Sequence, residues 1–139
     1  MADQTYEPID AIAVVIKDAT GIEPTCGEGQ DLQDFLETKA TAAKSGVRLF
    51  VAYNGFTDAD RYASGYESDG GAENYTLYIQ TDKNLRAIVN KIRAYLNDET
   101  AGNADFTDTS YNRRMITATG GAAMREKGFG VFEMNIRIL

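Results

Sequence analysis

Apolar positions near the N-terminus recur at the spacing of a helix. They fall at i, i+3, i+4 and i+7, on Ile9, Ile12, Ala13 and Ile16. Pro8 suits the first helical turn, and Gly21 suits the end of the helix. We therefore predict a helix over residues 9–17, followed by a turn-rich connection over residues 21–30.

Two further segments have helical patterns. The first covers residues 31–44, with Gly46 as a candidate C-cap. The second covers residues 82–97, with Asp82 as a candidate N-cap. It carries the cleanest helical stripe of the chain, formed by Leu85, Ile88, Val89, Ile92 and Leu96.

Four segments have the pattern of strands, namely residues 47–53, 75–81, 113–119 and 129–139. The last one alternates strictly, which predicts Phe132, Met134, Ile136 and Ile138 inward and Glu133, Asn135 and Arg137 outward. Polar stretches at residues 54–74 and 98–112 are predicted loops, and the glycine-rich stretch at 120–128 is a predicted turn.

The order of these elements predicts the fold class. Helices and strands follow as helix, helix, strand, strand, helix, strand, strand, which is typical of an α+β protein. We expect a mixed or antiparallel sheet of about four strands packed by about three helices. At 139 residues the chain has the length of a single domain, residues 1–139.

Composition removes most enzyme classes. Histidine is absent, which excludes histidine-based general bases and Ser-His-Asp or Cys-His nucleophile pairs. A single cysteine, Cys26, excludes an intrachain disulfide. The net charge of −7 argues against non-specific binding to DNA or to an anionic membrane. The acidic start is unlike a signal peptide, so we expect the protein to be used in the cytoplasm where it is made.

The remaining candidate chemistry is weak. Asp58, Asp60, Glu67 and Asp69 could hold a hard cation, but an EF-hand loop starting at Asp58 would meet Ala63 and Asp69 where glycine and glutamate are needed. The glycine pairs lack the context of a phosphate loop. Acidic neighbours, Glu23 and Glu28, make Cys26 a poor nucleophile. We expect no catalytic residue, no metal and no cofactor.

Tyrosines are concentrated on and around the predicted loops, at positions 53, 62, 66, 75, 78 and 111. Tyrosine is enriched at protein interfaces because it buries a large area and keeps a hydrogen bond. Covering sheet edges within one subunit explains the cluster equally well.

The ordered pattern of the chain resembles the Mu-like minor tail proteins, which are akin to the tail terminators of long-tailed phages. The resemblance starts with the helix at 9–17 and the motif Asp31-Leu32-x-x-Phe35-Leu36. It continues through Ala42-Ala43 to the strand Val47-Arg48-Leu49-Phe50-Val51 and the strand at 75–81. The long helical stripe and the final strand around Gly130-Val131-Phe132-Glu133 complete it.

This resemblance implies a structural role in the virion. Such proteins form rings, commonly of six subunits, that cap the tail tube, stop its growth and dock it to the head. The implied partners are further copies of the chain, the tail tube protein and the head-completion or neck proteins, without a membrane. DNA would pass through the ring without specific binding, and negative charge suits such a passage.

An interface in such a ring needs two different patches. One predicted patch contains Tyr62 and Tyr66. The other is either the exposed side of the final strand, with Glu133 and Arg137, or the second polar loop near Phe106 and Tyr111.

Two alternatives stay open at this point. The first is a head-completion or neck protein of the same particle, which would have a similar size and ring habit. The second belongs to a different class, a small cytosolic enzyme that uses carboxylates such as Asp58, Asp60 and Glu67 as acid and base. A tail tube subunit is disfavoured because tube proteins are richer in strands.

Overall fold

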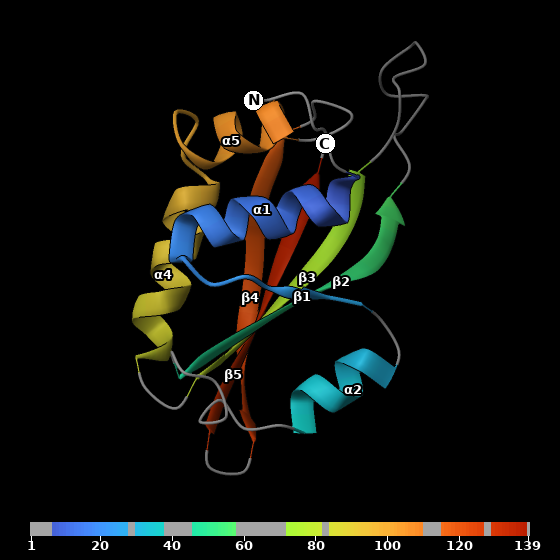
Figure 1. The fold of residues 1–139 in the computed structure, drawn as a ribbon, viewed down its shortest axis with the longest axis vertical. Coiled ribbons are helices and arrows are strands. Elements are labelled where there is room, and N and C mark those ends of the chain that lie inside the picture. Colours follow the sequence, from blue (N-terminus) through green and yellow to red (C-terminus); the bar gives the residue numbers. More distant parts are fainter. Residues whose placement is uncertain are drawn as a thin grey trace.

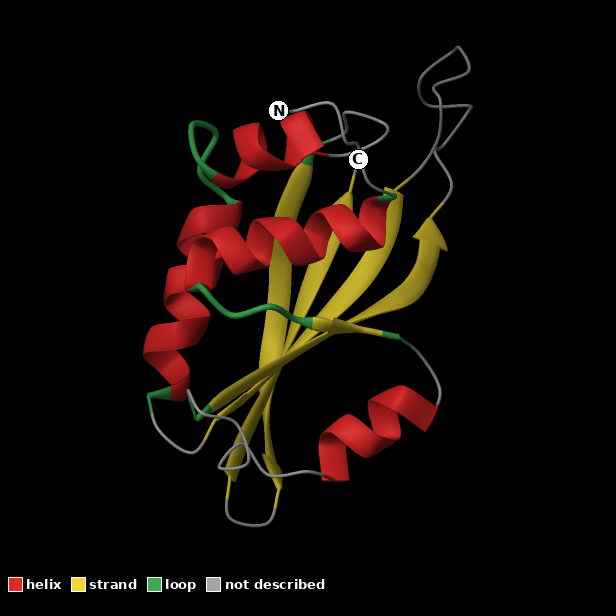
Figure 2. Ribbon diagram, viewed as in Figure 1, coloured by secondary structure: helices red, strands yellow, loops and turns green. Residues whose placement is uncertain are grey.

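The structure of the protein is a computed structural model that describes residues 7–27, 30–37, 46–57, 72–81, 84–109, 115–126 and 129–138. It is an α+β domain in which helices pack on a five-stranded sheet (Figures 1 and 2). The strands are β1 (Thr25–Cys26), β2 (Val47–Thr57), β3 (Ala72–Thr81), β4 (Ile116–Glu126) and β5 (Phe129–Ile138). The helices are α1 (Pro8–Thr20), α2 (Gln30–Glu37), α4 (Leu85–Leu96) and α5 (Gly102–Thr109).

The sheet is mixed and has the order β1-β2-β3-β5-β4. Its four long strands are antiparallel to their neighbours, and only the two-residue β1 runs parallel to β2. This confirms the predicted fold class, with one strand more than expected. The extra strand is β1, which lies inside the predicted turn-rich connection.

One face of the sheet carries the main core. The side chains of Leu49, Val51, Leu77, Ile79 and Met134 point to this face and are buried under α1, α4 and α5. Figure 1 shows α1 lying across the strands with α4 beside it. The stripe predicted for the third helix is confirmed, since Val89, Ile92 and Leu96 are buried on α4. The inward set on β5 is also confirmed, with Phe132 only partly buried.

The opposite face carries a smaller core under α2. Phe35 of α2 packs against Phe50 of β2, with the ring centroids 5.3 Å apart. The guanidinium of Arg48 lies 4.5 Å from the centre of the Phe35 ring and donates a hydrogen bond to the Phe35 carbonyl at 2.8 Å. Arg48, the only charged residue of the strand predicted at 47–53, therefore connects α2 to the sheet.

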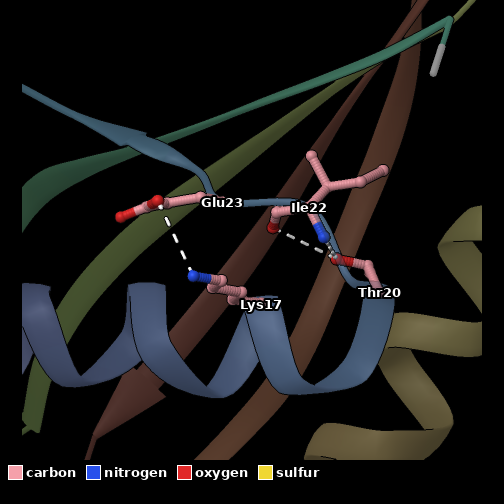
Figure 3. Close-up of polar contacts among 4 residues, drawn as sticks. All are labelled: Lys17, Thr20, Ile22 and Glu23. Atoms are coloured by element: carbon pink, nitrogen blue, oxygen red, sulfur yellow. Dashed lines mark hydrogen bonds and ion pairs between the residues drawn. The ribbon is translucent and has the colours of Figure 1, made fainter. Parts of the chain in front are cut away.

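The end of α1 follows the predicted chemistry. Pro8 lies in the first turn, and Gly21 adopts a φ of +78° while its N–H donates to the Lys17 carbonyl. Beyond the helix, the N–H of Ile22 donates to the Thr20 hydroxyl, and an exposed Lys17–Glu23 pair at 3.9 Å spans the turn (Figure 3). An exposed pair of this kind contributes little to stability.

The predictions for two segments are wrong, and several predicted ends are shifted; for example, β2 continues to Thr57 and β3 begins at Ala72, inside the predicted loop at 54–74. The predicted loop at 98–112 contains the helix α5, and the predicted turn at 120–128 is largely the second half of β4. Asn84, in the left-handed region at φ +58°, is the N-cap residue of α4, while Asp82, the predicted N-cap, lies outside the described residues. The predicted helix at 31–44 is described from Gln30 to Glu37, and its remainder lies outside the described residues.

Candidate functional site

An open groove of about 620 Å³ lies between α4 and the two strands at one side of the sheet. Its floor is apolar and includes Val89, Phe132 and Met134. The groove therefore lies beside the main core, between α4 and β4, the outermost strand of the sheet. We call it the α4–β4 groove.

The helix supplies the polar rim of this groove. Arg86, Asn90 and Arg93 follow one another at spacings of four and three residues, which places them along one line of α4. All three are exposed, while Val89 and Ile92 turn into the core. The rim is thus a polar line next to the buried stripe.

The charge of α4 is opposite to that of the whole chain. The helix holds three of the 14 basic residues, Arg86, Lys91 and Arg93, and none of the 21 acidic ones. Among the described residues, no carboxylate forms an ion pair with Arg86 or Arg93. Two guanidinium groups therefore stand over an apolar floor and are available to a negatively charged partner.

The other wall of the groove is β4, which is an edge strand. Within the described chain β4 pairs only with β5, so its outer side has no neighbouring strand. Asn97 covers the start of this edge, because its side-chain oxygen accepts from the Ala118 N–H at 2.8 Å and from the Thr117 hydroxyl at 3.0 Å. Beyond Ala118 the edge is open over small residues. Exposed edges of this kind are pairing surfaces.

The far end of β2 forms a second exposed surface, which we call the β2 tip and define by Tyr53, Phe56 and Glu73. Phe56 is 67% exposed and Tyr53 is 44% exposed, and both are large apolar side chains. Glu73 of β3 lies directly opposite Phe56 in the register. Its Oε2 accepts a hydrogen bond from the Tyr75 hydroxyl at 2.8 Å, and the Tyr75 ring packs edge-on against Tyr53 at 5.4 Å. The tip is therefore an apolar knob with a carboxylate beside it.

The two surfaces share one face of the sheet and lie at opposite sides of it. Residues paired in an antiparallel register point to the same face, so Phe56, Glu73 and Tyr75 face the side of α1 and α4. β3 and β5 separate β2 from β4, which at about 4.8 Å per strand is roughly 14 Å. Figure 1 shows the end of β2 and the helix α4 on opposite flanks of the molecule.

The six residues predicted for a subunit interface differ from one another in where they lie. Phe106 is fully buried in the main core, so it is not a surface residue and this expectation is corrected. Arg137 is exposed and Glu133 is half-buried on β5, both on the face of α2. Burial, together with the charge of Glu133, raises the pKa of Tyr78 beside it. Tyr62, Tyr66 and Tyr111 lie outside the described residues.

The thiol and the carboxylates that the sequence offered as chemical groups lie either on β1 or outside the described residues. Cys26 is half-buried on β1, and burial, followed by the charges of Asp10 and Glu23, raises its pKa to about 11. A thiol with that pKa is a weak nucleophile at neutral pH, as the sequence predicted. Asp58, Asp60, Glu67 and Asp69 lie outside the described residues. Where the chain is described, no group of three or more potential metal-ligating side chains occurs.

Neither surface was predicted from the sequence, although part of the signal is present there. The spacing of Arg86, Asn90 and Arg93 on a helix without acidic residues marks a positively charged rim. Apart from Val89 on the helix itself, however, the floor of the groove and its other wall come from residues about 30 to 45 positions later. Only the packing of β4 and β5 beside α4 brings them together.

Comparisons by sequence find no matching protein family and no matching curated protein. None of the described helices combines the length and apolar character needed to cross a membrane.

Proposed function

We propose that this protein is a phage tail terminator subunit that forms a ring at the head-proximal end of the tail tube. The observation that carries the proposal is the pair of unclosed sheet edges. Within the part of the chain that the structure describes, β4 is an 11-residue edge strand, and on the other side β1 covers only Phe50 and Val51 of β2. Two different open surfaces on opposite flanks suit a head-to-tail contact, which closes into a ring when the rotation per subunit allows it.

The order of the elements supports the same proposal. Apart from Ala42-Ala43, which lies outside the described residues, the features on which the resemblance to Mu-like minor tail proteins rests fall on α1, α2, β2, β3, α4 and β5. They are parts of one α+β domain, and the long helix packs on the sheet that the hydrophobic strands form. The ring commonly found in that family has six subunits, and we propose the same number here.

The charge of the chain fits the proposed position in the virion. A net charge of −7 repels the phosphates of DNA, so a channel built from this protein would let DNA slide without holding it. The proposed partners are further copies of the chain, the tail tube protein and a head-completion protein. The proposed role is structural, without catalysis and without a cofactor.

Removing the gene from the phage or injection device that encodes this chain tests the proposal. We expect tail tubes of uncontrolled length and heads without tails, because a terminator stops tube growth and provides the docking surface. Tails of normal length that fail to join heads would instead identify a neck protein. Particles of normal structure and infectivity would contradict any structural role in the virion.

A further inference from the structure

We infer that the α4–β4 groove receives the β2 tip of a second copy of this chain, with Phe56 seated on the apolar floor beneath Arg86 and Arg93. This inference rests on the proposed ring, and it names the two surfaces that meet in it. A ring contact is heterologous, so the two surfaces must be different and both must be present on every subunit.

Shape and polarity favour this pairing. Phe56 is the most exposed of the large apolar side chains among the described residues. The groove offers about 620 Å³ above Val89, Phe132 and Met134, enough for an aromatic ring and its neighbours. An exposed aromatic side chain and an unfilled apolar groove both gain from the removal of water.

Charge favours a second copy over another partner of similar shape. Arg86 and Arg93 form no ion pair with a described carboxylate of their own chain, whereas the β2 tip carries Glu73 next to Phe56. The knob is thus linked to negative charge, and the groove has a positive rim.

The placement of the two surfaces also suits repetition. Both surfaces lie on the face of the sheet that α1, α4 and α5 cover, at opposite flanks of the molecule (Figure 1). A neighbour displaced along the sheet, with its helices on the same side, presents its β2 tip to the groove without being turned over. The same step repeated around an axis produces a ring or a helical array.

Cross-linking between two marked copies tests this contact. One copy carries Asn54→Cys, beside Phe56 on the β2 tip, and the other carries Asn90→Cys on the rim of the groove. Both carry Cys26→Ser, so that each has a single thiol. After treatment with a short bismaleimide linker at high protein concentration, we expect the mixed dimer in clear excess over a control mixture. In the control, Arg137→Cys on the opposite face replaces Asn90→Cys.

Variants of the contact residues distinguish a specific contact from cross-linking by random collision. Phe56→Ala in the first copy should lower the yield of mixed dimer by about tenfold, since burial of the ring is lost. Arg86→Glu with Arg93→Glu in the second copy should lower it as well. Lys91→Glu is the matched control, because it reverses a charge on the same helix away from the groove, and it should leave the yield nearly unchanged.

The inference is overturned if the Asn90→Cys pair gives no more product than the Arg137→Cys pair, or if Phe56→Ala leaves the yield unchanged. These results are separate from the test of the proposed function. Specific cross-linking together with normal particles after gene removal would leave the contact intact and contradict the virion role. Altered tails without specific cross-linking would contradict the contact alone.

Discussion

Two asparagine side chains hold the region between α4 and β4 together. The buried Asn103 donates from Nδ2 to the Leu96 carbonyl at 3.1 Å and accepts from the Ile116 N–H at 3.1 Å. It thereby joins the last turn of α4 to the first residue of β4. Asn97 makes similar bonds to Thr117 and Ala118, but in an exposed position. The geometry of the groove depends on these amides, because they fix its two walls relative to each other.

Replacing Asn103 tests this role. Asn103→Ala leaves a buried N–H and a buried carbonyl without partners, so we expect the free energy of unfolding to fall by about 2–3 kcal/mol. Asn97→Ala, the exposed counterpart, should cost about 1 kcal/mol or less because water replaces the lost bonds. Urea unfolding of both variants measures the difference. Equal losses would contradict the assigned role of burial.

Tyr95 gives the protein a predictable response to alkali. Burial, then the hydrogen bond to Asp105 and its charge, raise the pKa of Tyr95 from 10.0 to about 12. Between these values the unfolded chain loses the phenolic proton and the folded protein keeps it. The stabilising contribution of Tyr95 is therefore complete below pH 10 and is lost as the pH rises to about 12.

The variant Tyr95→Phe tests this dependence. It lacks both the hydrogen bond and the titrating group, so it should be less stable than the wild type at pH 8. The stability gap should narrow as the pH rises toward 12. Urea midpoints measured at several pH values follow both proteins, and a gap that stays constant over this range would contradict the assignment.

At the scale of elements, the regular amphipathic segments were predictable and the irregular ones were not. The stripe of α4 and the alternation of β5 are determined by local sequence periodicity, and the structure places both as expected. Helix α5 lacks such a stripe, and a single aromatic residue, Phe106, anchors it in the core. Only the tertiary contacts of Asn103 and Phe106 distinguish this segment from a polar loop.

The glycines of β4 show why the predicted turn at 120–128 is wrong. Glycine pairs usually mark turns, but Gly121 lies in a strand where a Cβ would collide with the Phe132 ring and the Glu133 carbonyl. Because Gly121 has no side chain, β5 can approach β4 closely at this point, and the space beside Gly121 stays open as part of the groove. This reason is invisible in the sequence, because Phe132 reaches Gly121 only after the hairpin has formed.

A pair of neighbouring substitutions tests this reading of the glycines. Gly121→Ala should destabilise the protein by about 1–3 kcal/mol, since backbone as well as the Phe132 ring must move. Gly120→Ala places its methyl group in open space, and its effect should be within about 0.5 kcal/mol. Thermal or urea unfolding compares the two. A Gly120 variant that is as unstable as the Gly121 variant would contradict the close-approach argument.

At the scale of the whole molecule, the proposed contact makes each subunit a building block with one knob, the β2 tip, and one groove, the α4–β4 groove. Complementary variants make this testable in solution. The Phe56→Ala protein has an intact groove but a damaged knob, and the Arg86→Glu, Arg93→Glu protein has an intact knob but a damaged groove. Neither protein should therefore assemble alone. A mixture offers one intact contact between the two proteins. We expect a 1:1 dimer that grows no further, visible as a change in mass by light scattering.

Larger assemblies in that mixture would show that another surface also joins the subunits. No association in the mixture, under conditions in which the wild type assembles, would show that knob and groove do not meet.

Electron microscopy of intact particles from the phage or injection device that encodes this chain tests the proposed ring most directly. We predict a ring of this protein at the head-proximal end of the tail tube, with the β2 tip of each subunit in the α4–β4 groove of its neighbour. Absence of the protein from purified particles, or its presence elsewhere than at that end of the tube, would contradict the proposed ring.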